Sequence, residues 1–234
     1  MAVAIDQTGT VTKGSTGTTN DNSSLTIGSI SNGVLVAWVS HNSTAASETV
    51  IWDPAGANQA LTLIKEQIQA TGTPRVRLYG LVNPTAGNKI LRTTWTGSDE
   101  FYITLASFSG ASQVGGTTTF PNSVGATGTS TTAAVTITTA VGNLVIANHI
   151  TDQAAITAVN NTQVFLDITN TITSGAGNRA AGAASPVTLN ATLGNSGRWA
   201  SCGCDIAAAV AATQTLTFGP RWWEGSFETE IVNY

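Results

Sequence analysis

Residues 34–41 read VLVAWVSH, and this apolar stretch returns later in the chain as LVIANHI at 144–150. Each copy follows a turn that contains glycine, Ser31-Asn32-Gly33 or Val141-Gly142-Asn143, and a strand-like run, SSLTI or AAVTI, lies before each turn. A repeat within a sequence indicates that one structural unit occurs twice, and so it constrains the architecture. The stretch predicts two halves, each of which leaves an apolar face for the other to cover.

The similarity continues in the same order along both halves. VRLYGLV at 76–82 is followed by Asn-Pro, and RAAGAAS at 179–185 is followed by Pro. ITLASFSGA at 103–111 then matches WASCGCDIA at 199–207. We therefore predict an internal duplication with halves 23–111 and 133–208.

The composition favours an all-β protein. Only 9% of the 234 residues are charged, against about a quarter in typical globular domains. Threonine, serine and asparagine supply the polar surface instead, and threonine suits the exposed face of a strand. Long exposed helices, which use Glu, Lys and Arg, are not expected.

Short strand-like runs are separated by Gly, Asn and Pro turns, with no helical period. This pattern predicts an antiparallel β-sandwich of jelly-roll type, and a closed barrel is the alternative. The predicted strands are 24–30, 34–40, 50–52, 60–64, 75–82, 89–95, 100–108, 134–138, 143–151, 163–168, 179–184, 187–193 and 199–206.

Three segments differ in character from the strands. Residues 1–22 are rich in Thr, Gly and Asn and predict an N-terminal arm or edge strand followed by a loose loop. The Gly/Thr/Ser-rich residues 112–132 predict a surface linker between the halves. Residues 209–234 predict a C-terminal arm. Because residues 34–40 are apolar on both faces, we expect an arm or a neighbouring subunit to cover one of them.

The C-terminal arm is unusually rich in aromatic residues, and such side chains are costly to leave in water. We expect it to dock on another surface. The candidate assembly contacts are Phe218, Trp222, Trp223, Phe227 and Tyr234.

Charge and hydropathy exclude several classes of partner. The net charge is -4 with nine scattered basic residues, so we expect no nucleic-acid partner. No apolar run is long enough to span a bilayer, and the N-terminus lacks a basic start and an apolar core. We expect no membrane partner and no signal peptide.

Candidate catalytic groups are few. His41 and His149 are the only histidines, and we interpret both as polar strand ends, because a histidine base needs a partner within hydrogen-bond reach. A hydrolase would need a distant carboxylate beside Asp99-Glu100, such as Asp53, Asp152 or Asp167. We interpret Cys202 and Cys204 as small core residues. We predict no catalytic residues, no metal and no cofactor.

Tryptophans offer an alternative function. Trp52 and Trp95, with Trp199, could form a platform on which sugar rings stack, as in carbohydrate-binding modules. Each lies in an alternating apolar pattern, which favours a place in the core. Glycan binding through Trp52 and Trp95 is therefore the alternative hypothesis.

Several stretches in order carry a family resemblance: Leu25-Thr26, then NGVLVAWVS, RVRLYGLVNPTAG, ITLASFSGA and the closing WASCGCDIA. Together they resemble a jelly-roll or β-sandwich module of uncharacterised tailed-bacteriophage virion structural proteins, of the decoration or fibre type. The resemblance covers residues 23–208 and does not include the aromatic arm. Its motifs concern packing and turns, so it implies a fold and a context without an active site.

The resemblance implies a non-enzymatic structural component of a phage particle, most simply a capsid decoration protein. Such a protein would be made in the host cytoplasm and reside in the virion. Its partners would be its own copies and other capsid or tail proteins, with a host glycan as the alternative ligand of a fibre domain.

Overall fold

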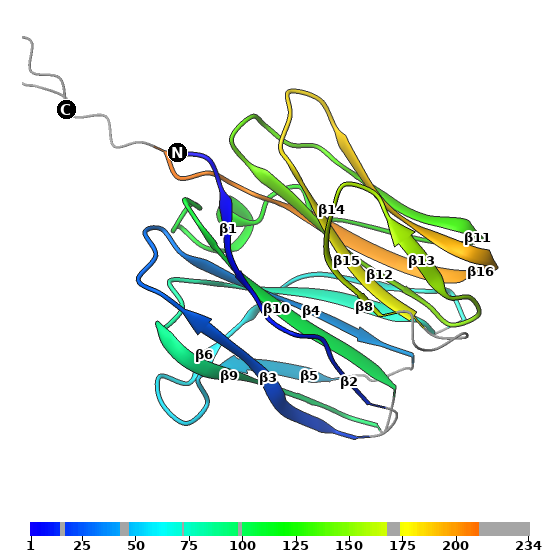
Figure 1. Cartoon of the computed structure of the whole chain (residues 1–234), viewed down its shortest axis with the longest axis horizontal. Helices are drawn as coiled ribbons and strands as arrows, with labels where there is room; N and C mark the ends of the chain where they lie inside the picture. The colour runs from blue at the N-terminus through cyan, green and yellow to red at the C-terminus, as the bar shows by residue number, and fades with distance from the viewer. Residues whose placement is uncertain (15–16, 43–46, 72, 98–99, 168–173, 211–234) are drawn as a thin grey trace, which may run out of the picture.

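The computed structural model describes residues 1–14, 17–42, 47–71, 73–97, 100–167 and 174–210. The described chain is almost entirely antiparallel β-structure, with one short helix, α1 (Gly116–Thr119), as the prediction of an all-β sandwich requires (Figure 1). The strands are β1 (Ala4–Thr8), β2 (Thr12–Gly14), β3 (Thr19–Ile27), β4 (Val34–His41), β5 (Glu48–Trp52), β6 (Gln59–Ala60), β7 (Thr62–Ile68), β8 (Arg75–Val82), β9 (Gly87–Trp95), β10 (Phe101–Ser109), β11 (Val124–Ile137), β12 (Leu144–Thr151), β13 (Ile156–Val159), β14 (Thr162–Asp167), β15 (Ser174–Ala181) and β16 (Val187–Ile206).

The strands form three sheets. The first has the order β1-β10-β4-β8-β7, with β2 also paired to β10. The second has the order β3-β9-β5-β6. The third has the order β11-β16-β12-β15-β14, with β13 also paired to β16.

The first sheet lies in the middle of the molecule and is covered on both faces. Its strand β4 sends Leu35, Ala37 and Val39 into a core shared with the second sheet, and Val34, Val36 and Trp38 into a core shared with the third. All eight residues of β4 are buried. The expectation that an arm or a neighbouring subunit covers β4 is therefore wrong, because the chain's own two other sheets do so.

The third sheet folds over itself. Its longest strands, β11 and β16, pair along most of their length, with a register shift between Ser130 and Thr132. Beyond this shift, residues 132–137 of β11, residues 187–193 of β16 and β13 form an outer layer, and a further apolar core, with Val135, Val145 and Leu189, lies beneath it. Figure 1 shows this second half stacked on the first.

The two halves have the same strand order. The order β1-β10-β4-β8-β7 in the first sheet corresponds, strand for strand along the chain, to β11-β16-β12-β15-β14 in the third. The order β3-β9-β5 in the second sheet likewise corresponds to the outer layer β11-β16-β13. The internal duplication itself stays a prediction, and this correspondence is the arrangement that a duplication would leave.

Polar contacts join the halves across the central core. The indole Nε1 of Trp38 donates a hydrogen bond of 2.9 Å to the carbonyl oxygen of Ala147. The Asn148 amide nitrogen donates to the carbonyl oxygens of Val39 and Arg77, and its oxygen accepts a bond from the hydroxyl of Ser40. These bonds fix β12 on β4 and β8, because a buried polar group is costly unless it is paired.

Two of the predicted segments have more structure than expected. β1 confirms the edge strand within residues 1–22, but the loose loop is wrong, because β2 and the start of β3 occupy it. The linker predicted at 112–132 is shorter than expected, because β11 already begins at Val124. The low hydropathy of these two threonine-rich segments predicts loops. In the structure, parts of both segments are partly exposed strands, because their backbones pair with apolar neighbouring strands.

The strands predicted at 187–193 and 199–206 are a single strand, β16. Gly194 and Gly197 lie between them, where β16 changes register against β11 and where the sequence predicts a turn. β13 was not predicted. No helix among the described residues is long and apolar enough to cross a membrane.

Candidate functional site

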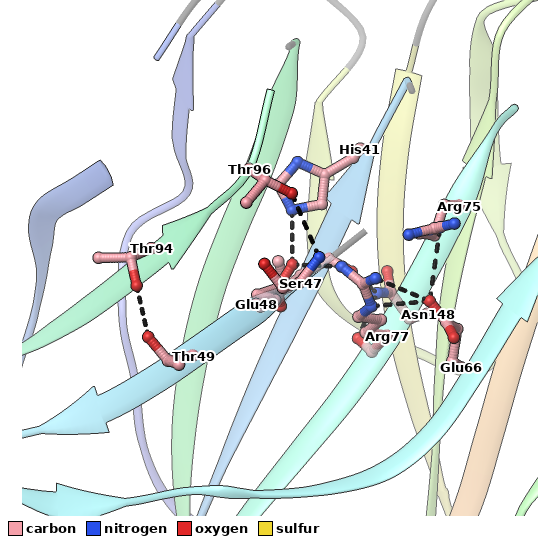
Figure 2. Close-up of polar contacts among 11 residues, drawn as sticks. His41, Ser47, Glu48, Thr49, Glu66, Arg75, Arg77, Thr94, Thr96 and Asn148 are labelled. Carbon is pink, nitrogen blue, oxygen red and sulfur yellow. Dashed lines mark hydrogen bonds and ion pairs between the residues drawn. The ribbon is translucent and has the colours of Figure 1, made fainter. Parts of the chain in front are cut away.

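A buried ion network lies near one end of the first half (Figure 2). Glu48 on β5 accepts bonds at Oε2 from His41 Nε2 at 2.8 Å and from Arg77 Nη1 at 2.6 Å. Arg77 also contacts Oε1 of Glu66 through Nε at 2.9 Å and Nη2 at 2.8 Å. Arg75 Nε lies 3.4 Å from the same oxygen. The network connects β4, β5, β7 and β8 and so joins the first and second sheets.

Burial and neighbouring charges shift the pKa values of Glu48 and Arg77 in opposite directions. Burial alone would raise the pKa of the Glu48 carboxyl, but the hydrogen bond from His41 and the charges of His41 and Arg77 hold that pKa below its ordinary value. Burial would likewise lower the pKa of Arg77, and the charge of Glu48 raises it above the ordinary value. The ion pair is therefore formed inside the protein although both side chains are almost fully buried.

Aromatic rings cover the histidine side of the network. The rings of His41 and Trp95 are tilted, with centroids 5.0 Å apart, and Trp95 contacts Phe101 in the same way at 4.9 Å. Among the residues that the structure describes, His41 Nδ1 and Trp95 Nε1 have no hydrogen-bond partner although both are buried. Because His41 and Glu48 are enclosed and tied to each other, we interpret the network as a stabilising contact between layers.

A second polar network lies in the second half and was not foreseen from the sequence. His149 Nδ1 is 2.8 Å from the Ser201 hydroxyl, and its Nε2 is 3.1 Å from Oδ1 of Asn178. The Asn178 amide nitrogen donates to Asn160 and to the carbonyl oxygen of Asn190, so its oxygen must face the imidazole. His149 therefore carries its proton on Nε2 and accepts from Ser201.

A hydroxyl, an imidazole and an orienting amide in a row are the groups that nucleophilic catalysis uses. Here Ser201, His149 and Asn178 are all fully buried. Burial lowers the pKa of His149 to about 4, although the bond with Asn178 opposes this. The three residues come from β16, β12 and β15, so no local pattern marks them. We interpret them as a paired polar core.

An apolar surface pocket lies beside the short helix. It encloses about 230 Å³ between the end of β8, the start of β7 and the segment around α1. Its apolar lining comes from Leu63, Ile64, Leu81, Val82 and Phe120. Leu63 is 45% exposed, so the pocket opens to solvent at that residue.

The chain passes this pocket just before residue 211. The amide of Ala207 donates to the carbonyl oxygen of Thr119, next to the pocket residue Phe120, and the amide of Ala209 donates to Gly110. Val210 is 92% exposed. Other exposed apolar side chains near these segments are Met1, Val114 and Val141.

A second, polar pocket lies at the turns after β3 and β8. Its lining includes Ser29, Gln59, Asn83 and Thr85. Gln59 is already engaged, because its amide oxygen accepts bonds from the backbone and the hydroxyl of Thr85. The pocket therefore offers amide and hydroxyl groups without an exposed aromatic ring.

The tryptophans predicted as a sugar platform are in the wrong place for that role. Trp52 is fully buried and Trp95 is 4% exposed, both in the core between the first and second sheets. Both lie in an alternating apolar pattern, which is typical of core residues. Because both are buried, neither presents a ring face to a glycan. Trp199 is also buried. The five candidate assembly contacts, Phe218, Trp222, Trp223, Phe227 and Tyr234, lie outside the described residues.

The carboxylates considered for a hydrolase are held apart in separate ion pairs. Asp53 pairs with Lys89, Asp152 with Arg198, and Asp167 with Lys13. Cys202 and Cys204 are buried in the central core, as expected. The described ranges contain no group of three His, Cys, Asp or Glu side chains that could hold a metal ion.

No protein-family model matches the chain, and no curated protein is significantly similar to it. The resemblance to phage virion modules therefore stays a prediction based on the residues quoted for it.

Proposed function

We propose that the chain is a non-enzymatic structural component of a tailed-bacteriophage particle, a surface or decoration protein of the capsid that docks on its own copies and on other virion proteins. One observation carries this proposal. The exposed apolar side chains and the apolar pocket gather where the aromatic residues 211–234 are attached. Exposed apolar surface of this kind is typical of an interaction site.

The interior of the protein supports a structural role. Both histidines are enclosed and engaged in the core, as are Glu48 and Ser201. His41 and Glu48 bond to each other between two sheets, and His149 and Ser201 bond to each other within the third sheet. The result is a compact scaffold whose described surface is mostly neutral and polar.

In this proposal only the C-terminal segment acts as an arm. Residues 4–8 and 12–14 pair with β10, so the N-terminal segment belongs to the sandwich. We therefore assign the docking role to the segment after Val210.

The proposal is tested on particles of the phage or prophage that encodes the chain. An antibody against residues 1–210 is applied to density-purified particles, and the particles are also analysed by peptide mass spectrometry. We expect surface labelling and recovery of peptides from the chain. Particles that lack the chain would overturn the proposal, and labelling at the tail alone would overturn the placement on the capsid.

The polar pocket favours glycan binding as a second candidate function. Its amide and hydroxyl groups could form hydrogen bonds with a sugar without ring stacking. Saturation-transfer NMR with host-wall oligosaccharides tests this directly. Signal transfer that disappears in a Gln59→Ala variant would support a sugar site, and no transfer to any sugar would exclude those tested.

A further inference from the structure

We propose that the apolar pocket beside α1 is the docking site for Trp222 or Trp223 of a second copy of the chain. This inference rests on the proposed function and adds an acceptor surface and an occupant to it. Its basis is the size of the pocket, the course of the chain at Val210 and the residues that follow.

The pocket has the size and chemistry that an aromatic side chain needs. An apolar cavity of about 150 Å³ is large enough to bind benzene, and this pocket encloses about 230 Å³. Leucine, isoleucine, valine and phenylalanine side chains line it, and polar groups at Thr62, Thr117 and Ser123 border it. A polar border around an apolar floor suits the indole of tryptophan, which has one polar N–H.

The part of the pocket formed by Phe120 is tightly packed and therefore rigid. Phe120 packs directly on Gly80, where an added Cβ would lie 2.4 Å from the ring. The segment before Phe120 is braced by Thr119, whose hydroxyl donates to the carbonyl oxygen of Ser112 and accepts from the amide of Gly115. A site formed before binding loses less entropy when its ligand arrives.

The direction of the chain favours a second copy over the same molecule. Residues 207–209 run antiparallel to 110–112, so the chain moves from Ser112 towards Gly110 and away from the wall of the pocket at Gly115–Thr117. Trp222 follows Val210 by twelve residues, which can extend over about 40 Å. This length reaches a neighbouring molecule.

Two identical copies could exchange these segments reciprocally. Each copy carries both this pocket and this aromatic segment, so a twofold arrangement satisfies both at once and closes the assembly. The exchanged contact would also cover Leu63, which is half-exposed in the isolated chain.

Disulfide trapping tests the inference in the full chain, because both native cysteines are buried. One variant carries Thr117→Cys at the pocket wall and another carries Glu224→Cys, next to Trp223. The two are mixed and oxidised. The control replaces Thr117→Cys with Thr157→Cys, an exposed position on β13 in the outer layer of the second half.

We expect the pocket mixture to form a covalent heterodimer in clear excess over the control mixture. Leu63→Ser in the pocket partner should reduce the yield roughly tenfold by removing apolar contact area. Ala158→Ser, at an exposed position on β13 outside the pocket lining, should leave the yield unchanged.

Two results would overturn the inference. Yields equal to the control would show that the pocket is not the acceptor. A double variant, Thr117→Cys with Glu224→Cys, that forms only an intramolecular disulfide would show that the segment docks on its own molecule. If particles contain the chain but trapping fails, only this inference falls, because the particle experiment does not depend on the pocket.

Discussion

His149 is an uncharged imidazole in the core of the second half, and its position makes the stability of the protein depend on pH. Burial lowers its pKa from 6.5 to about 4. The unfolded chain therefore binds more protons than the native protein between these values. By linkage, the free energy of unfolding is highest above pH 6.5 and decreases as the pH falls towards 4.

We expect this residue to remove about 2 kcal/mol of stability between pH 7.5 and pH 5. The measurement is urea denaturation of wild type and of His149→Gln at both pH values. The variant should be less stable at pH 7.5 and should lose less on acidification. An equal pH dependence in both proteins would contradict a buried neutral His149.

Glu48 is the opposite case, a carboxylate kept charged inside the protein. Replacing it by Gln leaves Arg77 and His41 without their charged partner, and we expect a loss of roughly 3 kcal/mol at pH 7. Asp21→Asn is the control, because Asp21 forms an ion pair with Arg92 that is far more exposed. Its loss should be smaller, since solvent screens the pair.

The pH dependence due to Glu48 has a defined direction. Because its pKa in the native protein lies below the ordinary 4.5, its contribution is present above pH 4.5 and is lost as the pH falls through the native value. Acid denaturation of wild type and Glu48→Gln should therefore converge at low pH. A constant difference between the two proteins would contradict the charged pair.

At the scale of the elements, the crossover between the halves packs closely on β8. Phe120 packs on Gly80 of β8, and Ile64 lies 2.9 Å from the position of an added Cβ. Gly80→Ala must displace Phe120, so we expect a loss of roughly 1–3 kcal/mol through overpacking. Thermal unfolding measures this, with Gly28→Ala as the control, since nothing lies within 4 Å of its added Cβ.

A double variant identifies the cause of that loss. Gly80→Ala with Phe120→Leu should be more stable than the sum of the two single changes predicts, because the smaller side chain makes room for the methyl group. Strict additivity would show that the methyl group is accommodated elsewhere.

Strands with an apolar pattern could be predicted from the sequence, and those without one could not. VLVAWVSH coincides with β4, because a strand buried on both faces is nearly continuously apolar. RVRLYGLV coincides with β8, where Val76 and Leu78 alternate with Arg75 and Arg77 in the period of a strand. The threonine-rich start of β11 was interpreted as linker, since its strand character comes from pairing with β16. The sequence also cannot show which distant residues meet, so the contacts of His149 and Glu48 were missed.

At the scale of the whole molecule, the halves share a central core and cannot separate without exposing it. Trp38, Phe108 and Ile146 all lie in this core. We therefore expect one cooperative thermal transition, with equal calorimetric and van't Hoff enthalpies. Two resolved transitions in calorimetry, or tryptophan fluorescence and circular dichroism that disagree in midpoint, would contradict a single unit.

The long strand β16 determines how the molecule responds to a pulling force. A pull on residues 211–234 enters the domain along this strand, which is hydrogen-bonded to β11 on one side and to β12 and β13 on the other. Such a load shears many backbone bonds together, whereas a load across an edge strand would break them one after another. A chain held through this segment would therefore resist unfolding by force much better than its modest size implies.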